Sequence, residues 1–213
     1  MGLQDRYGDL HWIAVPIFWN EKEFAVKKVW FVMATVFALF VLIVRIEPAH
    51  FPNVVPLGAF AMWAGSYLGK RTAMFCVLAT LAVSDLILGG YAWQIMATVY
   101  LATVLFVPLG IAVRLFQGTW WQKAIAPFVG VGVGSTMFFF LTNSAVWLFG
   151  GLYPRTVSGL GACLVAGLPF FRNSMYGDLY GIGIFFGISV VLTTLAALFR
   201  QEVAQQTGFC SRS

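Results

Sequence analysis

The chain has 213 residues, of which 60% are hydrophobic and only 10% are charged. A soluble domain carries roughly 25% charged residues, so this composition excludes an ordinary water-soluble fold and predicts an all-helical integral membrane protein. The formal net charge of +5 then indicates how the chain is oriented in a membrane, and we expect no nucleic-acid partner.

The first 25 residues are rich in aromatic side chains, and we expect them to form an interfacial N-terminal arm. The apolar part of the arm is interrupted by Pro16 and is much shorter than the roughly 20 residues that cross a bilayer. Trp12, Phe18 and Trp19 either anchor the arm in the lipid headgroup layer or dock it against another membrane subunit. The sequence leaves both interpretations open.

Six hydrophobic segments follow the arm, and each predicts a membrane-spanning helix. They cover residues 26–46, 54–68, 72–88, 93–116, 124–149 and 179–199, which together form one membrane domain (26–199), and residues 200–213 form a tail. A further apolar stretch at 159–171 is too short to cross a bilayer alone. Because the polar residues Arg172, Asn173 and Ser174 follow it, we predict a short re-entrant or interfacial helix before the last span.

The distribution of basic residues supports this six-span arrangement. Arg45, Arg155 and Arg172 fall on one side of the membrane, and the other ten lysines and arginines fall on the side of the two termini. Cytoplasmic loops carry the excess of lysine and arginine in membrane proteins. We therefore predict that both termini are cytoplasmic.

Polar and indole side chains gather where the predicted helices reach the outer face. An ionisable group at membrane depth is costly and tends to face a cavity or a partner, so we predict an outward-facing pocket for a small ring-shaped ligand. Each polar residue alone is also explained as a helix cap or a turn residue. The candidate ligand-binding residues are Asn53, Trp63, Asp85, Asn143, Trp147, Asn173 and Asp178.

These residues belong to a longer pattern that resembles an uncharacterised family of bacterial membrane proteins. The pattern consists of Arg45, Pro52-Asn53-x-x-Pro56-Leu-x-Ala59, Gly65, Ser84-Asp85-x-x-x-Gly89, Thr142-Asn143-x-x-x-Trp147, Tyr153-Pro154-x-Thr156-x-x-Gly159-Leu160, Pro169-Phe170-Phe171-x-Asn173 and Gly177-Asp178. That family is similar to the substrate-binding S components of energy-coupling-factor (ECF) transporters. The resemblance covers about residues 29–199 and does not include the N-terminal arm.

The resemblance implies a multi-pass protein of the bacterial inner membrane that captures a small, vitamin-like organic solute for uptake. S components dock through small residues of their first helix on a membrane-embedded T component that works with ATPases. Ala34 and Ala38 match that small-residue pattern. Cobalt and nickel transporters of this kind begin with Met-His, whereas this chain begins Met-Gly-Leu, so the resemblance does not imply a metal substrate.

No motif in the sequence predicts catalysis. The chain has no Walker loop, no HExxH and no GxSxG, and Asp85 and Asp178 lack the flanking residues of intramembrane aspartyl proteases. Its three cysteines and two histidines are far apart, so we expect no metal and no cofactor. The alternative function is a non-catalytic accessory or structural subunit of a larger bacterial membrane complex, docked through the aromatic arm and small-residue helix faces.

Overall fold

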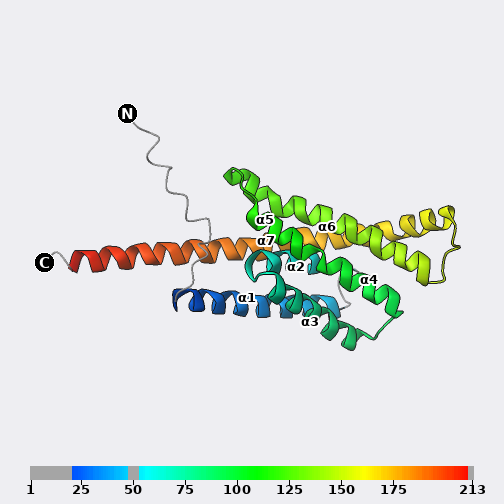
Figure 1. The fold of residues 1–213 in the computed structure, drawn as a ribbon, viewed down its shortest axis with the longest axis horizontal. Coiled ribbons are helices and arrows are strands. Elements are labelled where there is room, and N and C mark those ends of the chain that lie inside the picture. Colours follow the sequence, from blue (N-terminus) through cyan, green and yellow to red (C-terminus); the bar gives the residue numbers. More distant parts are fainter. Residues whose placement is uncertain (1–20, 48–52, 211–213) are drawn as a thin grey trace.

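The chain is an elongated helical bundle in a computed structural model, which describes residues 21–47 and 53–210 (Figure 1). The described residues form α-helices and no strand, as the composition predicts. The helices are α1 (Glu21–Ile46), α2 (Leu57–Tyr67), α3 (Lys70–Leu88), α4 (Trp93–Val104), α5 (Phe106–Leu115), α6 (Trp120–Phe149) and α7 (Val157–Cys210).

Five helical segments of the described chain are long and apolar enough to cross a membrane. They are residues 28–46, 70–88, 93–115, 120–149 and 157–199. These segments agree with the predicted first, third, fourth and fifth spans. The predicted second span and the region before the last span are built differently, and both differences shape the candidate site.

Helix α2 is too short to be a span in its own right. Its 11 residues extend over about 17 Å, roughly half of the hydrocarbon thickness of a bilayer. Every residue from Leu57 to Ser66 is buried. The segment predicted as the second span therefore starts inside the protein and forms the centre of the bundle.

Close contact between α2 and α5 depends on two glycines. A Cβ atom at Gly110 would collide with the carbonyl oxygen of Met62, and one at Gly65 would collide with the carbonyl oxygen of Val107. Small residues allow helix backbones to approach in this way in membrane proteins. Ser66 Oγ lies 3.0 Å from the carbonyl oxygen of Met62 and 2.8 Å from that of Gly110, where it strengthens the same contact.

The predicted fourth span is divided into α4 and α5 at Leu105. Pro108 explains the break, because proline lacks an N–H and its ring clashes with the carbonyl group four residues earlier, at Val104. Together the two helices still form one apolar segment of 23 residues that is long enough to cross a membrane. The break places Thr103 and Phe106 next to the N-terminal end of α2.

Helix α6 begins at Trp120, earlier than the predicted start at residue 124, because a capping box stabilises its first turn. The backbone N–H of Thr119 donates to Gln122 Oε1 at 2.8 Å, and the Thr119 side chain accepts the reciprocal bond. Such pairs satisfy two of the N–H groups that a helix start leaves without partners.

The prediction of a separate re-entrant or interfacial helix at 159–171 is wrong. Residues 157–210 form the single helix α7 of 54 residues, which runs the length of the molecule in Figure 1. Proline and polar residues are tolerated in a membrane helix when neighbouring elements satisfy the groups they leave open. Asp178 makes such contacts with α2 and α6, so the polar run does not interrupt the helix.

Candidate functional site

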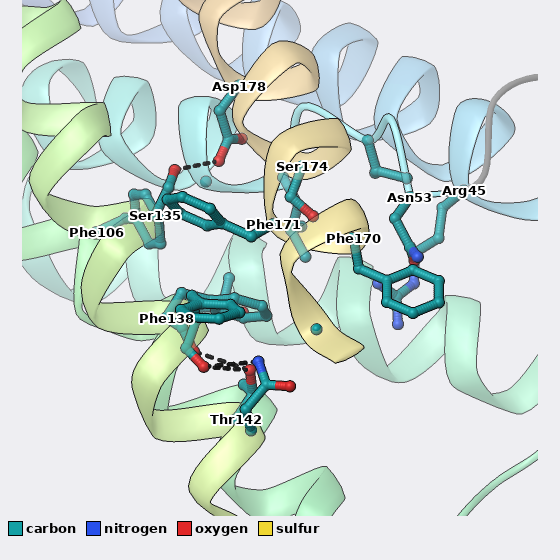
Figure 2. A pocket seen from close by; sticks show the side chains of 17 residues that line it. Arg45, Asn53, Phe106, Ser135, Phe138, Thr142, Phe170, Phe171, Ser174 and Asp178 are labelled. Atoms are coloured by element: carbon teal, nitrogen blue, oxygen red, sulfur yellow. Dashed lines mark hydrogen bonds between the residues drawn. The ribbon is translucent and has the colours of Figure 1, made fainter. Parts of the chain in front are cut away.

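A cavity of about 190 Å³ lies between the N-terminal end of α2, the break between α4 and α5, and the facing sides of α6 and α7 (Figure 2). Phenylalanine rings form much of its wall, and a few polar side chains are placed among them. The lining residues are Arg45, Asn53, Val55, Leu57, Gly58, Thr103, Phe106, Ser135, Phe138, Phe139, Thr142, Asn143, Gly167, Phe170, Phe171, Ser174 and Asp178.

Asp178 on α7 closes the N-terminal end of α2. Its Oδ1 atom accepts a hydrogen bond from the backbone N–H of Ala59 at 2.9 Å, and the backbone of Gly58 contributes a further bond. Its Oδ2 atom accepts the hydroxyl of Ser135 on α6 at 3.0 Å. A carboxylate is favourable at a helix start because the N–H groups there lack helical partners and carry partial positive charge. Asp178 thereby fixes α2 to α6 and α7 at one end of the cavity.

Two glycines make room for this arrangement. A Cβ atom at Gly58 would lie 2.6 Å from both Asp178 Oδ2 and the ring of Phe106. A Cβ atom at Gly177 would lie 2.7 Å from the backbone nitrogen of Val55. Both distances are shorter than real Cβ contacts, so a larger residue at either position would push α7 away from α2. In the Gly177-Asp178 pair, Gly177 thus lets α7 pack closely against the segment before α2, and Asp178 caps the first turn of α2.

Arg45 brings a positive charge to the cavity from the last turn of α1. One of its terminal nitrogens, Nη2, lies 2.7 Å from Oδ1 of Asp85 on α3, and the two side chains are 19% and 7% exposed. The contact joins only one atom of each group, because Nε of Arg45 and Oδ2 of Asp85 are buried without a hydrogen-bond partner. Arg45 lines the cavity and Asp85 does not.

Sequence reasoning did not select Arg45 as a site residue, although one signal pointed to it. An arginine at the end of one apolar span and an aspartate at the end of another would reach the same membrane face. Two opposite charges at one depth tend to pair, since an isolated buried charge is expensive. This pairing criterion would have identified Arg45 together with Asp85.

Asn53 and Asn143 both line the cavity, as their predicted role requires. Asn53 precedes α2 with a positive φ of 63°, a conformation that asparagine adopts more readily than most residues. The Asn143 side chain donates from Nδ2 to the carbonyl oxygen of Phe139 at 2.8 Å. Its Oδ1 atom lies beside Gly167, where a larger residue would collide with it. Whether these amides bind a ligand stays a prediction.

The structure places Trp63, Trp147 and Asn173 outside the cavity lining. Trp63 is fully buried, and its indole N–H donates to Ser189 Oγ at 2.8 Å within a cluster of aromatic rings. The Trp147 indole donates to the carbonyl oxygen of Pro154 at 2.9 Å and braces the connection between α6 and α7. The two indoles therefore serve packing and loop contacts rather than two walls of this cavity.

The residues predicted to dock a partner fall into two groups. Trp12, Phe18 and Trp19 lie outside the described residues. Ala34 is only 2% exposed, and Ala38 packs against the same core. The small-residue face of α1 thus already contacts other helices of this chain, and a partner could touch Ala34 only if the bundle opened.

Within the described part of the chain, no three His, Cys, Asp or Glu side chains lie together in a way that could hold a metal ion. Residues 25–201 match the model of a protein family that is described as a family of unknown function, DUF6580. The match includes all the residues given above as lining the cavity, from Arg45 to Asp178, and supports the predicted relation to an uncharacterised family. No curated protein and no solved structure matches the chain.

Proposed function

We propose that this chain, which belongs to the DUF6580 family, captures a small organic solute in the cavity between α2, α6 and α7. In this proposal it is a non-catalytic protein of the bacterial inner membrane with both termini in the cytoplasm: the five long apolar segments each cross the bilayer, and α2 with the residues just before it makes the sixth pass inside the bundle. The cavity then opens toward the outside, and capture is the first step of uptake. This role is like that of an ECF S component.

The composition of the cavity wall carries the proposal. Five phenylalanines surround a space into which a small number of polar groups project, including those of Arg45, Asn143 and Ser174. Binding sites for small molecules commonly combine apolar walls with a few placed polar groups. The volume of about 190 Å³ is below the range of roughly 300–1,000 Å³ that is typical of sites for drug-sized ligands, which favours a smaller solute.

The proposed orientation rests on where the charges lie along the helices. Lys70 and Arg71 lie in the first turn of α3, directly after its connection to α2, whereas Arg45 lies in the last turn of α1, at the end away from Glu21. Cytoplasmic loops are the ones enriched in lysine and arginine. With the basic turn in the cytoplasm, Arg45 and the cavity beside it fall near the outer face.

Filling the cavity tests solute capture directly. Ser174 lines the cavity from α7, so Ser174→Phe should occupy the space without removing a buried charge. Protein purified from its own membranes should carry a small compound that solvent extraction and mass spectrometry detect. The compound should be lost from Ser174→Phe and kept by Thr194→Phe, which adds the same ring at an exposed position of the same helix. Equal retention by both variants would contradict capture in this cavity.

The length of α7 favours an accessory subunit as the second candidate function. Its apolar segment Val157–Phe199 has 43 residues and extends over about 65 Å, which is about twice the hydrocarbon thickness of a bilayer. Even if the helix were tilted by about 40° from the membrane normal, part of this apolar segment would extend beyond the hydrocarbon layer. Apolar side chains at the two ends of this segment are exposed, among them Val157, Leu198 and Phe199. Apolar surface beyond the bilayer requires another protein to cover it.

Co-purification in mild detergent distinguishes the two functions. An ATPase pair that remains bound supports transport, whereas a larger complex without such ATPases supports the accessory role. In the second case, deletion of residues 2–20 should abolish the association while the helical bundle still inserts and folds. If the truncated protein retains the same partners in the same amounts, the arm is a lipid anchor rather than a docking segment.

A further inference from the structure

We propose that the captured molecule carries an acidic group and that Arg45 binds this group at the cavity wall. The inference deepens the proposed function and rests on it, because it requires a ligand in the cavity. It names the chemical class of that ligand: a flat, largely apolar body with a carboxylate or phosphate at one end.

Among the described residues that line the cavity, Arg45 is the only lysine or arginine. Figure 2 shows it on the same side of the cavity as Asn53 and Phe170, whereas Asp178 lies elsewhere on the wall next to Ser135. The guanidinium group is thus separated from the carboxylate that caps α2. A ligand can place an acidic end at Arg45 while its body extends along the phenylalanine wall.

The guanidinium group of Arg45 retains capacity to bind an anion. It has five N–H donors in a planar arrangement that matches a carboxylate or a phosphate. The contact with Asp85 joins one pair of atoms at 2.7 Å, and 19% of the Arg45 side chain stays exposed. Nε itself is enclosed, so a ligand in the cavity would reach the exposed part of the side chain. An acidic group there would add a second anionic partner beside Asp85.

The other charge in the lining argues against a basic ligand. Asp178 is the only carboxylate in the lining that the described part of the chain provides, and it already accepts hydrogen bonds from the backbones of Ala59 and Gly58 and from the hydroxyl of Ser135. A cation would have to compete with all of these donors, and its success would uncap α2. An acidic ligand could therefore bind Arg45, whereas a basic ligand would find only a carboxylate that is already hydrogen-bonded.

Asp85 acts as a positioning residue in this arrangement. It is 7% exposed, lies behind Arg45 and does not line the cavity, so it holds the guanidinium group without touching the ligand. A paired carboxylate also keeps the arginine from being a buried charge without a counterion when the cavity is empty. The acidic group itself has two possible sources, a soluble carboxylate or the phosphate of an anionic lipid.

Benzoate and benzamide form a matched probe pair for the experiment, because they have nearly the same shape and differ in charge. The full-length protein in neutral detergent should bind benzoate at least about tenfold more tightly than benzamide, measured by calorimetry and by thermal unfolding. Arg45→Gln should remove this preference. The single variant leaves the buried charge of Asp85 without a counterion, which could unfold the protein. The double variant Arg45→Gln with Asp85→Asn avoids this, because it removes both charges. Arg172→Gln, which changes an exposed arginine outside the lining, is the control.

The outcomes separate the inference from the proposed function. Equal binding of benzoate and benzamide, or a benzoate preference that survives in the double variant, overturns the acidic-group contact while the cavity remains a solute site. Failure of benzoate, benzamide and phosphatidylglycerol alike to bind the wild-type protein overturns the contact and the capture of a soluble solute together. A third arm replaces the probes with phosphatidylglycerol: stabilisation that depends on Arg45 in this arm alone supports the acidic contact, assigns it to lipid and contradicts solute capture.

Discussion

The carboxylate of Asp178 accepts a hydrogen bond from the backbone N–H of Ala59 at 2.9 Å, although the two residues are 119 positions apart in the sequence. This bond caps a helix that starts inside the protein. It also connects the longest helix, α7, to the most deeply buried one, α2. The capped helix end forms part of the cavity wall, so the stability of the bundle and the shape of the candidate site depend on the same residue.

Replacement of Asp178 by alanine should destabilise the protein strongly. It leaves the N–H of Ala59 and the hydroxyl of Ser135 buried without their acceptor, which we expect to lower the free energy of unfolding by about 2–4 kcal/mol. Asp178→Asn should cost less, since its amide oxygen still accepts from Ala59. Thermal unfolding in detergent provides the comparison. Equal losses for the two variants would show that the cap on α2 contributes little.

The pair Arg45 and Asp85 should show strong energetic coupling in a double-mutant cycle. Removal of either partner leaves a largely buried charge without its counterion, so Arg45→Gln and Asp85→Asn should each lower the free energy of unfolding by about 2–4 kcal/mol. The combined variant should lose less than the sum of the two, because no buried charge is then left alone. Purely additive losses, measured by denaturant unfolding, would mean that the 2.7 Å contact does not link α1 to α3 in solution.

Gly110→Ala should separate α2 from α5. The new Cβ atom would collide with the carbonyl oxygen of Met62, a backbone atom that cannot move aside like a side chain, so we expect a loss of about 2 kcal/mol or more. Gly132→Ala is the matched control, because a Cβ atom there meets nothing within 4 Å. Alanine favours a helix over glycine, so the control should be neutral or slightly stabilising. Similar effects of the two changes on thermal stability would contradict tight packing at Gly110.

The proposed orientation predicts where reporters will be found. Fusions before Gly2 and after Ser213 should both give cytoplasmic signals, because the basic turn at Lys70 and Arg71 then lies on the cytoplasmic side. A cysteine introduced at Gly151, in the connection between α6 and α7, should be labelled from the periplasm by a reagent that does not cross the membrane. A periplasmic signal from either terminus would contradict the orientation and the outward opening of the cavity.

The site could be predicted from the sequence only in part. Asn53, Asn143 and Asp178 were selected because polar residues near the ends of apolar segments tend to face cavities, and all three line the cavity. Trp63 was selected for its flat ring, but a ring buries equally well in a core, and its indole N–H pairs with Ser189. The sequence contains the residue types of a site but not the direction in which each side chain points.

The sequence by itself determined that the chain is an all-helical protein with several segments able to cross a membrane. That conclusion depends on local properties: long apolar runs, the scarcity of charge, and terminators such as the glycine before Lys70, where α3 begins. The hydrophobic length of a segment is a property of neighbouring residues. It can therefore be read without knowledge of the fold.

Only the tertiary structure decided that α7 continues through Pro169 and the polar run to Asp178, that α2 is a short buried helix, and that Arg45 reaches the cavity. The polar residues of these segments are stabilised by partners far along the chain, 40 residues away for Arg45 and Asp85 and 119 for Asp178 and Ala59. Alone, a polar run favours a break in a membrane helix, because each unpaired group in hydrocarbon is costly. Once folding supplies the partners, that cost disappears and the helix continues.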